Sequence, residues 1–176
     1  MLRGELIALR ARQEADLKVL HSELQDDVAT RSRSDNRPWR PVSPDIGTSP
    51  YDVAEPRDDV AAFSVVTLAD GELVGDALLW GIDNHNRLAH LGLGMFESAR
   101  GRGYGADVVQ VLCRYGFRVR GLHRLQVETL ADNAAMIAAA AKAGFVLEGT
   151  LRRGAWVDGA FVDEVILGLL VDDWRS

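Results

Sequence analysis

The sequence predicts an α+β sandwich, in which helices flank a mixed sheet. Two observations carry this prediction. Over residues 61–95, β-rich runs alternate with turn signals, which is typical of consecutive antiparallel strands. Beyond residue 103 the apolar spacing changes to steps of three and four, and a strand pattern then returns. A strand, helix and strand in succession imply one parallel connection within the sheet.

The first 60 residues divide into an ordered and an irregular part. An apolar run at residues 5–9 predicts a first strand, and residues 13–25 predict a helix, because their apolar positions recur close to the helical spacing. The pattern then collapses over residues 28–60, where all five prolines of the chain lie. We expect this segment to be irregular, and either mobile or a functional lid.

The remaining chain alternates between the two periodicities. A helix is expected from Gly103 to about Gly121, and a second one over residues 133–143 with Gly144 as its C-terminal cap. The last two expected strands are joined by the turn signal at residues 158–159 into a closing hairpin. The strands expected in this part are at residues 61–68, 73–82, 87–95, 124–130, 146–157 and 161–171.

Composition predicts one domain over residues 1–176 with 47% apolar and 26% charged residues. The 20 basic and 26 acidic side chains give a net charge of −6, which argues against a general nucleic-acid-binding surface. Cys113 is the single cysteine, so we expect neither an intramolecular disulfide nor a metal site. No apolar stretch approaches the roughly 20 residues that span a bilayer, and we expect a cytoplasmic protein without a membrane partner.

One segment is particularly informative about function. It reads Arg100-Gly101-Arg102-Gly103-Tyr104-Gly105-Ala106 and lies between a predicted strand and a predicted helix. Glycines let the backbone approach a ligand, and the first N–H groups of a helix have no partner within the helix. The helix dipole adds a partial positive charge there, which makes such a turn a cradle for phosphate oxygens. Six arginines against one acid lie between residues 100 and 124, so we infer an anionic ligand.

Other interpretations of this segment exist. A plain glycine-rich turn between strand and helix stays open as the structural alternative. A Walker A loop requires a Gly-Lys-Ser/Thr ending, which the segment lacks. The dinucleotide-binding fingerprint fits Gly101, Gly103 and Ala106, with Glu128 at about the required distance. That fingerprint also needs a strand that runs straight into the first glycine and further βαβ units, and neither is predicted.

At this point the sequence resembles a known family. The pattern Arg100-x-x-Gly103-x-Gly105 matches the R/Q-x-x-G-x-G/A acetyl-CoA motif of the GNAT superfamily of N-acyltransferases. Its surroundings resemble the branch that contains the ribosomal-protein alanine acetyltransferases RimJ and RimL. The resemblance is strong from about residue 61 to residue 174, weaker over residues 3–25 and absent from the proline-rich segment. The further matching segments are Leu91–Met95, Leu122–Leu125, Asn133, Gly144-Phe145, Glu148-Gly149 and Leu151-Arg152.

The resemblance implies a three-layer GNAT sandwich whose sheet of about seven strands splays between its fourth and fifth strands. In that opening the pantetheine arm of acetyl-CoA would pair with the backbone of Leu93, Gly94 and Met95. The segment 100–106 would hold the pyrophosphate through its backbone amides. Asn133 would bond to the cofactor, or would serve only as the N-cap of its helix, and the sequence leaves both roles open.

Acetyl transfer to an amine requires a base, because a lysine amine has a pKa of about 10.4 and a chain α-amine one of about 8. By the resemblance, Glu128 takes the position of a catalytic glutamate, with a solvated strand face as its structural alternative. His90 is the second candidate, either as base or as a hydrogen-bonding group. The positions of the family's general acids hold Met136 and Ala140, so no acid is identified.

The residues and the resemblance together imply an acetyl-CoA-dependent N-acetyltransferase. It would transfer the acetyl group directly to a primary amine, of a protein N-terminus or of a small molecule, within a ternary complex. A non-catalytic acyl-CoA-sensing module and a nucleotide-binding regulatory domain are the alternatives. Trp156, Phe161 and Trp174 lie in or after the closing hairpin, where a homodimer contact, an acceptor pocket or ordinary packing would account for them.

Overall fold

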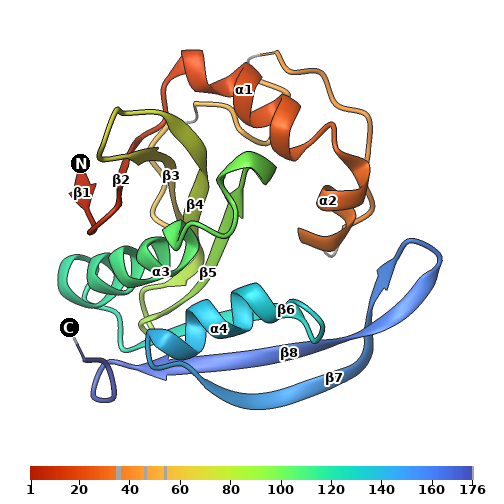
Figure 1. Ribbon diagram of the computed structural model, residues 1–176. Helices are drawn as coiled ribbons and strands as arrows, with labels where there is room; N and C mark the ends of the chain where they lie inside the picture. Colours follow the sequence, from red (N-terminus) through yellow and green to blue (C-terminus); the bar gives the residue numbers. More distant parts are fainter. Residues whose placement is uncertain (35–36, 46, 54, 176) are drawn as a thin grey trace.

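In the computed structural model, which describes residues 1–34, 37–45, 47–53 and 55–175, eight strands form one sheet (Figure 1). Their spatial order is β1-β2-β3-β4-β5-β6-β8-β7, and only the β5–β6 pair is parallel. This confirms the predicted mixed, mostly antiparallel sheet. The strands are β1 Leu2–Arg3, β2 Ile7–Ala11, β3 Val60–Thr67, β4 Leu73–Asp83, β5 Leu88–Met95, β6 Arg124–Leu130, β7 Val146–Val157 and β8 Ala160–Leu170.

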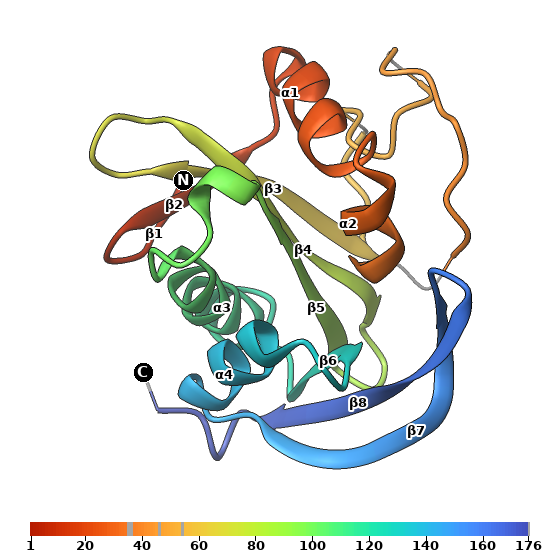
Figure 2. The ribbon, with the colours of Figure 1, turned by 45° about the vertical axis from the view of Figure 1, so that its right-hand side comes forward.

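Helices cover both faces of the sheet, so the predicted three layers are confirmed. Figures 1 and 2 show α3 and α4 on one face and α1 and α2 on the other. None of the helices in the described part of the chain is long and apolar enough to cross a membrane. The helical elements are α1 Glu14–Leu24, α2 Val28–Ser34, the 3₁₀ turn Glu97–Ala99, α3 Tyr104–Arg114, the π-helical turn Tyr115–Val119 and α4 Ala134–Lys142.

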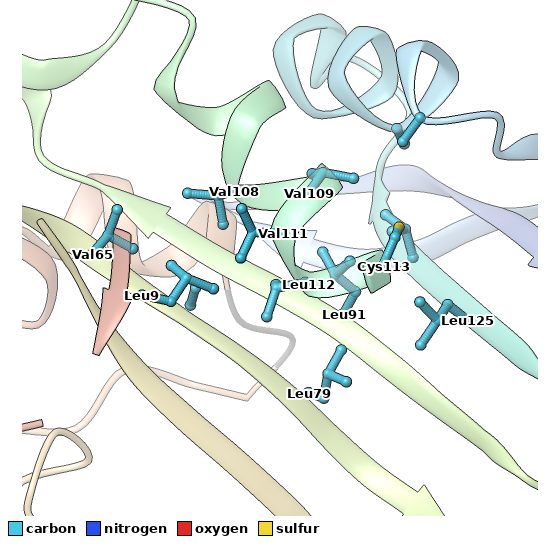
Figure 3. Close-up of a cluster of buried hydrophobic side chains, with 14 of the residues drawn as sticks. Leu9, Val65, Leu79, Leu91, Val108, Val109, Val111, Leu112, Cys113 and Leu125 are labelled. Carbon is cyan, nitrogen blue, oxygen red and sulfur yellow. The ribbon is translucent and has the colours of Figure 1, made fainter. Parts of the chain in front are cut away.

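The core that fixes α3 against the sheet follows from the helical spacing of its apolar residues. Val108 and Leu112 are fully buried and face the buried Leu79 and Leu91 of the central strands (Figure 3). Each such side chain stabilises the fold by about 1.5–3 kcal/mol. Burial also raises the pKa of the Cys113 thiol to about 12, so this cysteine is not a nucleophile. The core therefore holds the start of α3 rigidly beside β5.

The N-terminal region contains one strand more than the sequence predicts. The first strand was expected at residues 5–9, but β2 spans Ile7–Ala11, because residues 4–6 form a tight turn closed by a 2.8 Å hydrogen bond from Gly4 N to Ile7 O. The chain before this turn forms β1, whose residue Leu2 pairs with Leu9 of β2. Two-residue strands leave no periodicity in a sequence, so this addition was not foreseeable.

The segment expected to be irregular begins with a helix. The carboxylate of Asp27 accepts hydrogen bonds from the amides of Ala29 and Thr30, at 3.1 and 3.2 Å, and so caps α2. The prolines begin only at residue 38, which leaves residues 28–34 free to be helical. The described residues of 37–59 contain no helix or strand. The expectation of an irregular stretch is therefore wrong for residues 28–34.

The sheet opens between β5 and β6. These two strands pair only where Leu88, Ala89 and His90 face residues 124–126. From Leu91 onward the strands separate, and Figures 1 and 2 show the two ends diverging beside α3 and α4. Because β1 is additional, β5 and β6 are the fourth and fifth of the strands that the family resemblance implied. The predicted splay is thus confirmed, and it brings two helix N-termini to one opening.

Candidate active site

The β5 side of the opening is made of main-chain groups. Leu93, Gly94 and Met95 pair with β4 on one edge, through Ala77, Asp76 and Gly75 in that order, and have no β6 partner on the other edge. The structure therefore brings the three predicted pantetheine contacts to the opening. The guanidinium of Arg100 donates a 3.2 Å hydrogen bond to the carbonyl of Met95, so this arginine also lies at the same edge.

The N-terminus of α3 begins at a glycine and has no side-chain cap. Gly103 is the N-cap and has φ of +83°, the left-handed region that residues other than glycine rarely adopt. No side chain caps the helix, and the first amides, those of Tyr104, Gly105 and Ala106, have no acceptor within it. Gly101, also at positive φ, and the exposed Arg102 complete the predicted segment. The result is an uncapped, electropositive helix start beside β5.

The N-terminus of α4 differs, because its own side chain caps it. The Oδ1 atom of Asn133 accepts a 3.2 Å hydrogen bond from the amide of Met136, and its Nδ2 donates at 2.9 Å to Thr129 Oγ1. The N-cap role that the sequence left open is therefore confirmed. A contact between Asn133 and a cofactor stays a prediction. The same helix contains Ala140, which is fully buried, and Met136, which packs against the core.

The structure brings the two candidate bases together. His90 of β5 and Glu128 of β6 lie on the same side of the sheet, with His90 Nδ1 3.4 Å from Glu128 Oε1, within ion-pair reach but without hydrogen-bond geometry. Gln126 Nε2 donates a 2.7 Å hydrogen bond to that same oxygen. The His90 ring stacks on Trp80 with centroids 4.2 Å apart and an interplanar angle of 21°. Glu128 is thus an ionisable group oriented by two polar neighbours at the mouth of the splay.

A second carboxyl group, which the sequence analysis missed, lies near Glu128. Glu164 of β8 pairs with Leu130, two residue pairs beyond the Glu128–Ile166 pair and therefore on the same face. Burial, and then the charge of Glu128, raise the pKa of Glu164 above its usual value. The alternation of side chains along this strand was visible in the sequence, but the register that brings Glu164 near Glu128 was not. This face of the sheet therefore carries two neighbouring carboxyl groups.

Asp76 is another site residue that sequence reasoning missed. It is 8% exposed and lies on β4 opposite Gly94. Burial raises the pKa of Asp76 to about 6, although Arg12 and Arg31 oppose the shift. Arg12 Nη2 lies 3.5 Å from its Oδ2. The sequence predicts a strand at residues 73–82 but not the burial of this aspartate, because the burial results from the packing of α1 over the sheet.

These features define a protein of the acetyltransferase class: a sheet splayed at a parallel pair, an uncapped glycine-started helix, and an oriented carboxylate at the mouth. The only parallel pair in the described sheet is β5–β6, which does not fit the doubly wound fold of the dinucleotide alternative. No group of three or more His, Cys, Asp or Glu side chains suited to a metal ion occurs among the described residues.

Comparison with known proteins identifies the family. The model of the Acetyltransferase (GNAT) domain matches residues 7–146, and the chain therefore belongs to the GNAT acetyltransferase family. It is 24% identical to the uncharacterized N-acetyltransferase YokL of Bacillus subtilis, over 98% of this chain and 94% of that protein. Other curated relatives match over only 58–65% of their own length, and they include the ribosomal-protein-serine acetyltransferase of Escherichia coli.

Solved structures share the whole fold. A spermidine N-acetyltransferase from Vibrio cholerae, in complex with CoA and spermine, superposes with a TM-score of 0.81 at 21% identity, over 95% of this chain and 96% of that one. RimL, a ribosomal L7/L12 alpha-N-protein acetyltransferase in complex with coenzyme A, gives a TM-score of 0.78 at 20% identity, over 98% of both chains. These likenesses confirm the expected GNAT fold.

Proposed function

We propose that this protein transfers the acetyl group of acetyl-CoA to a primary amine by direct transfer in a ternary complex. The observation that carries the proposal is the uncapped start of α3 at Gly103, which lies beside the unpaired edge of β5. Three unsatisfied helix amides and a dipole of about half a positive charge favour an anion such as a diphosphate. The family membership supports the diphosphate of CoA as this anion.

The residues at the opening suit acetyl-CoA, which supplies the acetyl group as a thioester. Gly101–Ala106 would hold the diphosphate through backbone amides, with the guanidinium groups of Arg100 and Arg102 neutralising charge. The free edge of Leu93, Gly94 and Met95 would pair with the amides of the pantetheine arm and polarise the thioester carbonyl. This assignment needs no metal.

Glu128 would act as the base. An acceptor amine arrives largely protonated, since its pKa is about 8 to 10.4, and must lose a proton before it attacks. Gln126 donates to Glu128 Oε1, and His90 lies beside the same oxygen, so the carboxylate is oriented and His90 is placed to help relay the proton. General base catalysis of this kind contributes about 10²–10⁴-fold in rate.

The leaving thiolate would depart without a protein acid. Met136 and Ala140 carry no proton to donate, and the Cys113 thiol is buried. A thiol of pKa about 8.5 leaves acceptably as the thiolate. Holding amine and thioester together contributes up to about 7–11 kcal/mol, so positioning replaces acid catalysis here.

The acceptor is proposed to be an amine that enters from the α1–α2 side. Glu128 and Glu164 share this side, and two carboxyl groups favour an ammonium ion over a neutral or anionic acceptor. The relatives act on amines by their printed names, a ribosomal protein in one case and spermidine in another. A protein N-terminus and a small-molecule amine are both consistent with this charge. The proposed setting is the cytoplasm, where a buried free thiol such as Cys113 is common.

A homodimer through β7 and β8 is part of this proposal. β7 is an edge strand of the sheet, and Trp156 of β7 and its partner Phe161 of β8 are each 61% exposed. Long, exposed apolar edges are sites of strand association. Trp174 instead packs against Phe117 with ring centroids 5.4 Å apart, so it does not belong to this surface.

A non-catalytic acyl-CoA-sensing module is the second candidate, favoured by the missing acid at Met136 and Ala140. A thiol-release assay with acetyl-CoA across peptides, polyamines and aminoglycosides separates the two. We expect Glu128→Gln to reduce turnover by about 10²–10⁴-fold while CoA affinity in calorimetry is unchanged. Glu23→Gln, the same change at an exposed position of α1, is the control and should behave like the wild type.

The outcomes distinguish the candidates. Retained turnover in Glu128→Gln would remove Glu128 as base. CoA binding without turnover on any acceptor would favour the sensing module. Heat of binding with NAD or ATP but not with CoA would contradict both and leave the nucleotide-binding alternative.

A further inference from the structure

The first turn of α3 contains an acidic residue whose side chain hydrogen-bonds to another segment of the chain and not to its own helix. Asp107 is the fourth residue of α3, where a carboxylate would ordinarily interact with the helix dipole and the free amides of the first turn. Its carboxylate instead accepts three hydrogen bonds from a segment 100 residues away in sequence. They come from the amides of Glu5 at 3.1 Å, Leu6 at 2.7 Å and Ile7 at 3.0 Å.

The turn between β1 and β2 is shaped to receive this carboxylate. A Cβ atom at Gly4 would lie 2.4 Å from both carboxylate oxygens of Asp107, so only glycine permits the contact. At the other end of α3, the guanidinium of Arg114 donates a hydrogen bond to the carbonyl of Arg3. The turn is therefore bound to α3 at two points, through Asp107 and through Arg114.

The same turn contacts the glycine that starts α3. A Cβ built on Gly103 would lie 3.5 Å from Leu6 Cδ1, so the Leu6 side chain lies directly against the N-cap position. Leu6 is in turn fixed by its own amide, which donates to Asp107. A continuous chain of contacts thus runs from Asp107 through Leu6 to Gly103.

We infer that Asp107 is a positioning residue for the phosphate cradle: it clamps the β1–β2 turn against the start of α3 and so fixes Gly103 and the free amides that follow it. The inference rests on the proposed function, because it concerns the same diphosphate. Three amide donors also compensate the negative charge of Asp107, which would otherwise oppose an anion at this helix end.

The inference predicts a change in CoA affinity that is opposite in sign to the change expected from charge alone. Removing a negative charge beside a diphosphate site should strengthen anion binding if charge alone matters. In Asp107→Asn an amide NH₂ group would face one of the three N–H donors, so the clamp would loosen. If Asp107 positions the cradle, CoA binding weakens even though the site becomes more positive.

The experiment measures CoA affinity by calorimetry in the full-length protein, together with KM for acetyl-CoA and kcat. We expect Asp107→Asn to weaken CoA binding by about tenfold, consistent with the loss of one to two charge-assisted hydrogen bonds. KM for acetyl-CoA should rise by a similar factor while kcat stays near the wild-type value, a split that a general loss of stability would not produce. Glu97→Gln is the charge-matched control, since Glu97 is exposed three residues before Arg100 and makes no such contact.

Gly4→Ala is the second variant and changes no charge. Its Cβ would displace the carboxylate, so it should weaken CoA binding in the same direction as Asp107→Asn, and it keeps the test decisive if the aspartate variant folds poorly. Equal or tighter CoA binding in either folded variant would overturn the inference while leaving the proposed function intact. A wild-type protein that binds no CoA would overturn both.

Discussion

The two helices that begin at the opening, α3 and α4, start in opposite ways. At α3 the N-cap is a left-handed glycine, no side chain caps the helix, and the only acid of the first turn is bound elsewhere. At α4 the N-cap is Asn133, whose amide group satisfies the helix and also binds Thr129. The start of α3 has no side-chain cap, whereas at the start of α4 the side chain of Asn133 already pairs with the amide of Met136.

This difference separates the two walls of the opening by the kind of chemistry they offer. In the proposed function the β5–α3 wall would act through main-chain groups, which would bind a diphosphate and a peptide-like arm without regard to side-chain identity. In that proposal the β6–α4 wall would act through side chains, with Glu128, which lies 3.4 Å from His90 Nδ1, as the base. Glycine replacements should therefore damage the first wall, and side-chain replacements the second.

Blocking the backbone amides of the β5–α3 wall should have the largest effect, which is on CoA binding. Replacing both Gly103 and Gly105 by valine should abolish measurable CoA binding, a loss of at least about 100-fold, because a Cβ at φ +83° forces the cap to rearrange and bulk covers the amides. Calorimetry measures the binding, and circular dichroism checks the fold. Gly71→Val is the matched control, since Gly71 also has positive φ but lies in an exposed turn. Undiminished binding in the double variant would contradict the cradle.

A buried carboxyl group behind the first wall should make stability depend on pH. The pKa of Asp76 is 3.8 in its reference state and about 6 in the fold, so the folded protein holds this proton more tightly. The stabilisation from protonated Asp76 is full below about pH 4 and is lost as pH rises through about 6, with a maximum near 3 kcal/mol. The amide that Asp76→Asn introduces does not titrate, so the variant lacks this pH-dependent contribution.

The measurement is the free energy of unfolding of wild type and Asp76→Asn between about pH 4 and pH 7. The wild type should lose stability relative to the variant as pH rises across this window. Asp70 provides a control that should not vary in this window, because hydrogen bonds from Thr67 and Glu72 lower its pKa, so its contribution is lost only as pH falls below about 4. A difference between wild type and Asp76→Asn that does not vary with pH would show that the carboxyl is not buried as described.

Removing the N-cap of α4, in the β6–α4 wall, should have the smallest effect. Asn133→Ala should lower stability by about 1 kcal/mol, the usual cost of a lost N-cap, with CoA affinity within about threefold of the wild type. Asn133→Asp keeps a capping oxygen and should recover most of the stability. A tenfold loss of CoA affinity in the alanine variant would instead support the predicted contact between Asn133 and the cofactor.

The sequence predicted the elements that carry strong local signals. The glycine-rich segment before α3, the helical spacing of Val108 and Leu112, and the closing hairpin all appear where periodicity and turn residues indicated them. It missed α2, because the capping aspartate at residue 27 was outweighed by the prolines that follow. It also missed β1, since two residues are too few to show a period.

The candidate site likewise has a part that the sequence predicted and a part that it did not. The chain order alone determined that a glycine-rich segment precedes a helix and that Glu128 and Asn133 follow it at short spacing, since these are local properties of neighbouring residues. Only the tertiary structure decided that His90 meets Glu128, that Glu164 joins them, that Asp76 is buried, and that Asp107 reaches the β1–β2 turn. The physical reason is that strand register and helix packing bring together residues far apart in sequence, and no local pattern encodes those distances.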